Sequence, residues 1–325
     1  MIYPTLPPLT KGRSHVLLVF IMIYCHEKSV FPKLKIIGRL LGAHCSTEGG
    51  VATAPEIGSK IGCTAIQLFT TSNRQWRQRK ILVSDIDFFQ KNMEAGPIRI
   101  AFAHAMYLIN LAAPDPDVFK HSINAMIGEI RCADVLELPF VVIHPGSPKH
   151  KENKWGIYRI AEAISKVFEK TAALNVKIAL ETTAGQGSQV GHKFEELAMI
   201  MDIVKAPDHL GICFDTCHAF AAGYEIRTKE GYEKTWKEFD RIIGFEKLLA
   251  IHLNDSKGDL GSRIDRHEHI GKGKIGLQGF RNIMNDKRLH SIPMVLETPK
   301  ENDTMKNDTR NLRALLRLIK RKAGL

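Results

Sequence analysis

The stretch GICFDTCH, residues 211–218, begins as an apolar run and ends on a carboxylate, with a histidine three residues later. An apolar run of this length predicts a short buried strand. Asp215 and His218 are residue types that bind metal ions or transfer protons. A single Asp-x-x-His pair is also common in helix caps and polar loops, so this stretch alone leaves both interpretations open.

The same pattern recurs along the chain, since other short apolar runs also end on a residue that can bind a metal. Five such runs end on His104, His144, Glu181, His252 and Glu297. Successive ends lie between 34 residues apart (Glu181 to Asp215) and 45 residues apart (His252 to Glu297). That interval holds one strand, one helix and two loops, which together make one βα unit.

Two earlier apolar runs complete a set of eight, one ending at His44 and one, Ala65–Phe69, ending at Thr70. Eight βα units predict an α/β fold of the (β/α)₈ TIM-barrel type, whose active site lies at the C-terminal strand ends. Residues far apart in the sequence would then meet at one mouth. One such residue is easily an ordinary loop residue, but six in succession indicate a site.

Amphipathic segments separate the predicted strands, as a parallel barrel requires. They cover residues 117–136, 158–174, 194–204 and 231–243, and a last one runs through Leu312, Leu315, Leu316 and Ile319. Residues 306–322 around that last helix carry seven Lys or Arg against one Asp. This basic C-terminal helix is explained by a solvated face, with contact to nucleic acid as an alternative.

Composition favours a globular protein with a polyanionic partner. The 325 residues are 44% hydrophobic and 25% charged, with a formal net charge of +11 and a pI near 9.3. Such a balance suits nucleic acid, although it also serves solubility. The six cysteines include no Cys-x-x-Cys pair and are too sparse for a disulfide scaffold, so we expect a reducing intracellular compartment.

Residues 1–38 differ from the rest and are interpreted as an N-terminal extension, which leaves 39–325 for the barrel domain. Lys11 and Arg13 precede ten apolar residues, Val16–Cys25. That run resembles the apolar part of a signal peptide but is shorter than the ~20 residues that cross a bilayer. A targeting segment, a disordered arm and a membrane anchor stay open, with no stable membrane partner expected.

The loop after the second predicted strand mixes an aromatic residue with cations. It places Trp76 among Arg74, Arg77, Arg79 and Lys80. Such interleaving suits DNA phosphates together with a stacked or displaced base. The alternative is a solvated helix start.

A further group of candidate metal ligands lies between the seventh and eighth predicted strands. Asp265 and His267 alternate with Arg266, so in an extended loop they point to one side. Together with His218 they form an oxygen and nitrogen set suited to Zn²⁺. His269 falls on the same side and is interpreted as a supporting or uninvolved residue.

Nine segments between residues 42 and 299 occur in a characteristic order and spacing: GAHCSTEGG, LFTTSNRQWR, HAMYLINLAAP, IHPGS, LETTAGQGS, CFDTCHAFAAGY, HLNDSKGDLGSRIDRH, IGKGKIG and IPMVLETP. They resemble the endonuclease IV family of abasic-site DNA repair enzymes. The resemblance covers almost the whole predicted barrel. It implies a TIM barrel with three zinc ions at its mouth.

The resemblance implies specific roles for the candidate residues. His104, His144 and Glu181 match the ligands of a first zinc, and Glu181 also bridges to a second. The second ion would be held by Asp215, His252 and Glu297, and the third by His218, Asp265 and His267. Glu181 and Glu297 are the implied catalytic carboxylates, and Mn²⁺ stays an alternative at one oxygen-rich position. Arg74 and Tyr107 match residues that enter the DNA base stack.

Two departures from the family pattern are visible. Ala105 and Met106 follow His104 where the family has a polar pair, which would weaken DNA contacts near the third strand. Lys272 stands between two glycines where an acidic residue is common.

The expected activity is hydrolysis of DNA 5′ to abasic sites, leaving a 3′-hydroxyl, together with removal of 3′ blocking groups. The expected partner is double-stranded DNA that contains abasic sites or 3′-blocked ends, bound by a monomer. One alternative is a metal-dependent sugar isomerase or epimerase on the same type of barrel. Another is a DNA-binding pseudo-enzyme that no longer cuts.

Overall fold

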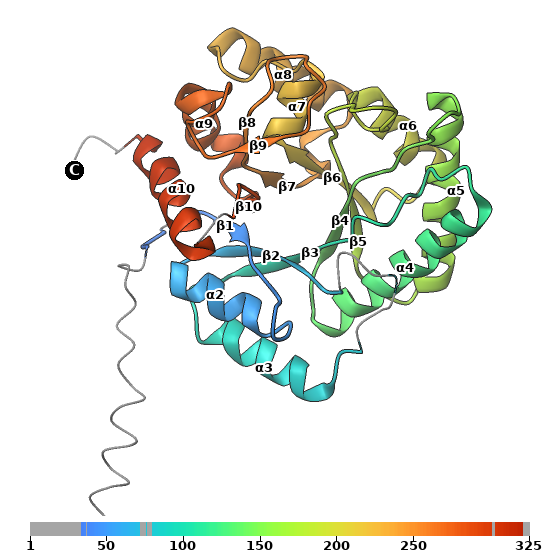
Figure 1. The fold of residues 1–325 in the computed structure, drawn as a ribbon, viewed down its shortest axis with the longest axis horizontal. Helices are drawn as coiled ribbons and strands as arrows, with labels where there is room; N and C mark the ends of the chain where they lie inside the picture. The colour runs from blue at the N-terminus through green and yellow to red at the C-terminus, as the bar shows by residue number, and fades with distance from the viewer. Residues whose placement is uncertain (1–33, 37, 72–75, 77–79, 301–302, 321–325) are drawn as a thin grey trace, which may run out of the picture. The chain divides into compact units, whose positions relative to one another are not determined.

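A computed structural model of the chain describes residues 34–36, 38–71, 76, 80–300 and 303–320 (Figure 1). Three predictions of the sequence analysis lie outside these residues. They are the structure of most of the N-terminal extension, the placement of Arg74 and the last residues of the basic C-terminal segment.

Eight parallel strands form a closed barrel in the order β1-β10-β7-β6-β5-β4-β3-β2. Their bounds are β1 Leu41–His44, β2 Ala65–Phe69, β3 Ile100–His104, β4 Phe140–Ile143, β5 Lys177–Glu181, β6 Leu210–Asp215, β7 Leu248–His252 and β10 Met294–Leu296. A short antiparallel pair, β8 Asp255–Ser256 and β9 His267–Glu268, lies outside this sheet. The predicted TIM barrel is confirmed, and each observed strand ends within one residue of its predicted end.

Helices surround the barrel, as Figure 1 shows. The helices are α2 Thr53–Ile61, α3 Val83–Glu94, α4 Pro116–Val135, α5 Asn153–Thr171, α6 Phe194–Val204, α7 Thr216–Ala222, α8 Lys229–Ile242, α9 Gly276–Asn285 and α10 Thr304–Leu318. Two single turns of 3₁₀ helix, Phe245–Lys247 and Lys287–Leu289, precede β7 and β10. The predicted amphipathic helices are confirmed, with α5 starting five residues before its prediction.

Helix α7 was not predicted, although it begins directly at the stretch that decides the fold. Asp215, the last residue of β6, is its N-cap, and Asp215 Oδ1 accepts a hydrogen bond from the His218 backbone N–H at 2.8 Å. The chain therefore turns from strand to helix in one residue. This cap holds Asp215 and His218 in a fixed relation to each other.

The first described residues pack against the barrel. The Leu34 backbone N–H donates to the Ile61 carbonyl at 3.1 Å, and Leu34 and Ile36 pack against the main hydrophobic core. The compact unit runs from Leu34 to Leu325. In the part of the chain that the structure describes, no helix combines the length and apolar character needed to span a bilayer.

Candidate metal centre

The polar side chains at the barrel mouth follow a simple rule of alternation. Each lies two residues after a small or apolar residue on the same strand, and neighbours separated by two residues face the same side of a sheet. Seven of the lower residues belong to one buried cluster inside the barrel. The pairs, lower residue first, are Gly42 and His44, Ala65 and Gln67, Phe102 and His104, Val142 and His144, Ala179 and Glu181, Cys213 and Asp215, Ala250 and His252, and Val295 and Glu297.

The first predicted ligand set converges on a single oxygen atom. His104 Nε2 lies 3.1 Å from Glu181 Oε2, and His144 Nε2 lies 3.0 Å from the same oxygen. Ligands at about 2.0–2.1 Å from a tetrahedral zinc ion are roughly 3.3 Å apart. The three side chains of this set therefore form a group that can hold a metal ion.

The second predicted set gathers around the other oxygen of Glu181. His252 Nδ1 lies 3.0 Å from Glu181 Oε1, 3.2 Å from Glu297 Oε2 and 3.7 Å from Asp215 Oδ2. These four residues also form a group with metal-ligand spacing. Glu181 is fully buried and belongs to both groups, which is the arrangement a bridging carboxylate requires.

The third predicted set is also brought together, with one difference. His218 Nε2 lies 3.3 Å from His267 Nε2 and 3.1 Å from Asp265 Oδ1, and His267 Nε2 lies 3.7 Å from Asp265 Oδ1. Asp215 Oδ2 is also 3.7 Å from His267 Nε2, so Asp215 reaches this group as well as the second one. Either aspartate can complete a three-residue site with the two histidines.

Charges within the cluster shift its titration strongly. Burial alone would raise the pKa of Glu181, but the neighbouring charges of His144 and His252 hold that pKa well below its usual range. At Glu297 burial is likewise outweighed, chiefly by His252, and the pKa is lowered. Burial would lower the pKa of His218, yet Asp215 and other carboxylates raise it well above normal.

The residues fit a metal ion because four of the five histidines hold a free ring nitrogen toward the cluster. In each, the other ring nitrogen faces an oxygen atom: His104 Nδ1 faces the Ala105 carbonyl, His218 Nδ1 the Thr182 carbonyl, His267 Nδ1 the Glu297 carbonyl and His252 Nε2 the Gln67 amide oxygen. Such partners fix the tautomer and direct the remaining lone pair at a metal. His218 Nε2 and His267 Nε2 also face each other at 3.3 Å, a spacing at which one metal ion can bind both nitrogens.

Three further polar residues at the mouth, the buried Asn254 and Gln67 and the half-buried His44, were not assigned a role from the sequence. Asn254 Nδ2 donates to Asp215 Oδ2 at 2.7 Å, and its amide oxygen accepts from the Glu297 backbone N–H at 2.8 Å. Gln67 contacts His44, His252 and Glu297. The period-two alternation, which marks Gln67 and His44 as inward-facing, is the sequence feature that identifies them.

Strand β2 was expected to end on Thr70, but the residue that it presents to the site is Gln67. Thr70 and Thr71 instead donate to the carboxylate of Glu129, a buried residue of α4. Burial raises the pKa of Glu129, against the effect of these hydrogen bonds. Glu129 therefore anchors the start of the loop that carries Trp76.

Tyr107 lies beside the metal cluster and is largely exposed. Its side chain is 59% accessible, and its ring centroid lies 5.8 Å from that of His104 and 6.2 Å from that of His144. Trp76, from the loop after β2, lies against His121 at a centroid distance of 5.7 Å. Tyr107 is thus exposed at the edge of the candidate site, where a bound molecule can reach it.

The structure is consistent with the interpretation of Ala105, Met106 and His269 from the sequence. Ala105 and Met106 are buried in the main core, so the residues in place of the family's polar pair pack inside the protein and offer no surface to DNA. His269 Nδ1 lies 3.0 Å from Asn311 Nδ2 on α10 and belongs to none of the three metal groups. Lys272 is exposed, as a phosphate-binding residue would be.

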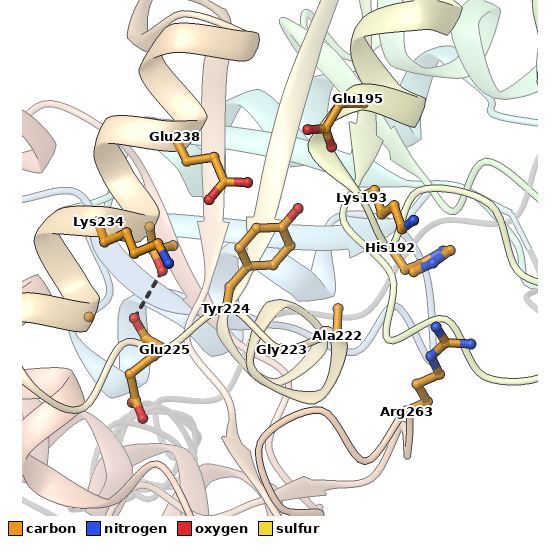
Figure 2. Close-up of a pocket in the computed structure, with 12 residues that line it drawn as sticks. His192, Lys193, Glu195, Ala222, Gly223, Tyr224, Glu225, Lys234, Glu238 and Arg263 are labelled. Atoms are coloured by element: carbon orange, nitrogen blue, oxygen red, sulfur yellow. Dashed lines mark hydrogen bonds between the residues drawn. The ribbon is translucent and has the colours of Figure 1, made fainter.

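A pocket of about 600 Å³ lies outside the cluster, and none of its lining residues belongs to the proposed ligand set. Figure 2 shows Tyr224 at its centre, with Glu238 from α8 on one side and Glu195, His192 and Arg263 on the other. Its wall carries both cations and carboxylates. That mixture does not select a phosphate, so the metal cluster remains the candidate functional site.

Comparisons with known proteins agree with this geometry. The family described as "Xylose isomerase-like TIM barrel" matches residues 55–322. The protein named probable endonuclease 4 of Geobacter sulfurreducens is 44% identical over 282 residues, which cover 87% of this chain and 95% of that protein. This chain belongs to the endonuclease IV family. Its relative in Chloroflexus aggregans, with the same name, is 44% identical over 281 residues, covering 86% of this chain and 97% of that one.

Solved structures separate the endonuclease IV family from proteins that share only its fold. Endonuclease IV from Thermus thermophilus is 35% identical, with a TM-score of 0.76, and the match covers 86% of this chain and 98% of that one. A D-tagatose 3-epimerase-like protein superposes with a TM-score of 0.66 at 18% identity, over 86% and 97% of the two chains. The epimerase likeness shows the barrel alone, and the nuclease relatives favour the expected nuclease over the sugar isomerase.

Proposed function

We propose that this endonuclease IV family member hydrolyses the phosphodiester bond on the 5′ side of abasic sites in double-stranded DNA and leaves a 3′-hydroxyl. The observation that carries the proposal is the convergence of all nine predicted ligands on one buried, three-part cluster around Glu181. Removal of 3′ phosphate and phosphodiester blocks uses the same bond chemistry and is proposed as a second activity.

Three zinc ions are proposed as the cofactor, with Mn²⁺ as an alternative at the oxygen-rich second position. His104, His144 and Glu181 would hold the first ion. Glu181, Asp215, His252 and Glu297 would hold the second. His218, His267 and Asp265 would hold the third, with Asp215 close enough to share it.

Bound divalent ions would neutralise phosphate charge, provide a nucleophile near neutral pH and stabilise the leaving oxygen. The chain's own residues prepare that chemistry. Glu181 is ionised and buried, and its two oxygens serve different groups, so it fixes their separation. Glu297 has one oxygen held by Gln67 and a side chain that is still 13% exposed, and we assign it the orientation of the attacking water.

Recognition of the abasic nucleotide is assigned to Arg74 and Tyr107. A nucleotide without a base costs less to turn out of the duplex than a paired one, and inserted side chains then fill the gap. Tyr107 supports this proposal through its exposure beside His104 and His144. Arg74 is assigned this role only because of its position in the sequence.

Replacing Arg74 and Tyr107 together by alanine tests this assignment. Zinc content should not change, while binding to an abasic duplex should weaken by about 10- to 100-fold, since a stacking contact is worth ~1–3 kcal/mol. Binding to an intact duplex, which depends on phosphate contacts, should change less at the same salt concentration. Equal losses on both duplexes would assign these residues to general affinity only.

The activity itself is tested with a duplex that contains one abasic site and is labelled at both ends. We expect a single cut, a 3′-hydroxyl product, loss of cutting with a chelator and recovery with zinc. An intact duplex serves as the control. Zinc and DNA binding without any cut would support the non-cleaving alternative, and turnover of a free sugar would support the isomerase.

The remaining proposals concern where and how the protein works. We propose that it acts as a monomer inside the cell, in a reducing compartment that contains DNA. The barrel domain is proposed to work without residues 1–33, because every proposed ligand and every segment that resembles the family lies after residue 38. A protein shortened to begin at Leu34 should match the full chain in zinc content and in cutting rate within about threefold, a difference of ~0.6 kcal/mol in barrier.

A further inference from the structure

Gln67 is a polar residue in the middle of a strand that is otherwise apolar. It lies in β2, between Ile66 and Leu68, and its side chain is fully buried. A buried amide is costly unless its hydrogen-bonding groups are satisfied. Its position in the layer of metal-binding residues therefore calls for a role.

All three of its polar contacts are with residues at the barrel mouth. Gln67 Nε2 lies 2.8 Å from His44 Nδ1 and 2.6 Å from Glu297 Oε1. Gln67 Oε1 lies 2.8 Å from His252 Nε2. One amide thus joins strands β1, β7 and β10.

The carboxylate of Glu297 determines which way the amide is turned. In the opposite orientation, the amide oxygen would face Glu297 Oε1 at 2.6 Å, and two acceptors would repel each other. The NH₂ group must therefore donate to Glu297 and to His44. The amide oxygen is left to accept a hydrogen bond from His252.

That orientation fixes the tautomer of His252. Its Nε2 carries the hydrogen that is donated to Gln67, so Nδ1 is the nitrogen that offers a lone pair to a metal ion. Nδ1 is the atom that faces Glu181 and Glu297 at 3.0 and 3.2 Å. The same amide also restrains the carboxylate of Glu297.

We propose that Gln67 is a positioning residue that presets His252 Nδ1 and Glu297 as ligands of the metal ion they share with Glu181 and Asp215. This inference rests on the proposed metal centre and adds a residue to it. Hydrogen-bond partners of metal ligands typically strengthen metal affinity by 10- to 100-fold. Because Gln67 is fully buried, water cannot replace its contacts when they are lost.

The test compares two variants of Gln67 with a control on the same segment. Gln67→Met keeps the length and volume of the side chain but removes every hydrogen bond. Gln67→Glu keeps the shape and places a carboxylate oxygen opposite Glu297. The control is Thr64→Val, because the buried Thr64 hydroxyl contacts the backbone of Arg39 and Leu41 at the opposite end of β2 from the cluster.

Zinc affinity is measured first, by competition with a chromogenic chelator and without DNA. We expect the weakest-bound zinc to lose 10- to 100-fold in affinity in both Gln67 variants and to keep its affinity in Thr64→Val. Should Gln67→Met fail to fold, Gln67→Glu carries the same comparison. Unchanged zinc affinity in a folded Gln67 variant would overturn the proposal, and so would an equal loss in Thr64→Val.

The tautomer is read directly from the ¹⁵N spectrum of the zinc-loaded protein labelled at histidine. Wild type should show a protected His252 Nε2–H, and Gln67→Met should lose that protection. An unchanged Nε2–H signal in Gln67→Met would contradict the assignment. A role in filling space alone would not move this signal.

Cutting of an abasic duplex is measured last, under single-turnover conditions at saturating zinc. The Gln67 variants should cut more slowly while binding the duplex within about threefold of wild type. If wild type itself does not cut, the proposed function fails, but the zinc and NMR results still decide the role of Gln67. If wild type cuts and Gln67→Met equals it in all three measurements, the Gln67 proposal alone fails.

Discussion

The inside of the barrel has two layers with opposite chemistry. The lower layer consists of small or apolar side chains such as Phe102, Val142 and Val295, and the ring of Phe102 lies 4.7 Å from that of Phe140 between centroids. The upper layer, two residues further along each strand, consists of imidazoles, carboxylates and one amide. The same backbone thus provides a packed floor and a reactive surface above it.

The two layers meet different physical requirements. The lower layer stabilises the fold by removing apolar surface from water. The upper layer buries charges, which is costly unless they are paired or bound to a metal. We therefore expect changes in the upper layer to affect metal and chemistry, and changes in the lower layer to affect stability.

The largest effect is expected for Glu181→Gln in the upper layer. The amide would remove charge from both groups that share Glu181, so cutting of an abasic duplex should fall by at least about a thousandfold, or ~4 kcal/mol in barrier. Single-turnover nicking measures this. Glu196→Gln is the matched control, because Glu196 is a buried carboxylate that bonds to the backbone of Gly191 and His192 away from the cluster. A rate for Glu181→Gln within threefold of wild type would contradict the bridging role.

The next effect is a pH dependence that comes from the metal cluster. The pKa values of His218 and His252 are raised well above the ordinary 6.5, where burial is outweighed mainly by Asp215 for His218 and by Cys213 and Glu297 for His252. These histidines hold protons in the metal-free protein, and zinc must displace them. Apparent zinc affinity should rise by about tenfold per pH unit for each proton released, and it should continue to rise above pH 6.5.

The free energy of unfolding should therefore respond to pH in opposite senses in the metal-free and in the zinc-bound protein. In the metal-free protein, a raised histidine pKa contributes stability that is fully present below about pH 6.5 and is lost as the pH rises through the folded-state pKa. The gain in melting temperature on adding zinc should thus grow between pH 6 and pH 8. A gain that shrinks over this range would contradict the proposed protonation.

The smallest effect on chemistry is expected for Phe102→Leu in the lower layer. The smaller side chain loses its contact with Phe140 and should reduce the free energy of unfolding by about 1–3 kcal/mol. Denaturant unfolding measures that loss. Zinc content and cutting rate per folded molecule should stay within about twofold, and a large loss of zinc would show that the layers are not independent.

Much of this arrangement could be predicted because each unit of the barrel repeats the same local pattern, an apolar strand followed by a polar residue at its C-terminal end. Eight apolar runs, seven of which end on His, Glu or Asp, predicted eight strands, and the barrel topology then placed His104, Glu181 and His252 together. The structure confirms the fold and shows that these residues converge. Their roles as ligands and the identity of the ions stay predictions.

The features that could not be predicted from the sequence depend on contacts between residues that are distant in the chain. The second strand was followed to its end at Thr70, but Thr70 bonds to Glu129 of α4 and the inward-facing residue is Gln67. The role of Asn254 could not be predicted because its partners, Asp215 and Glu297, lie at the ends of other strands. A helix cap at Asp215 was one of the two interpretations left open, but helix α7 itself was not predicted, since a strand that turns at once into a helix has no loop residues to mark it.

The central claim is that the upper layer, together with His218, Asp265 and His267, binds the metal ions with which this protein cuts DNA. The most direct measurement is the cutting rate of an abasic duplex as zinc is returned stepwise to the chelated protein, with bound zinc per chain measured on the same samples. We predict no cutting without metal, recovery as zinc binds, and a maximum at three ions per chain. Cutting by the metal-free protein, or three bound zinc ions without any cutting, would contradict the account.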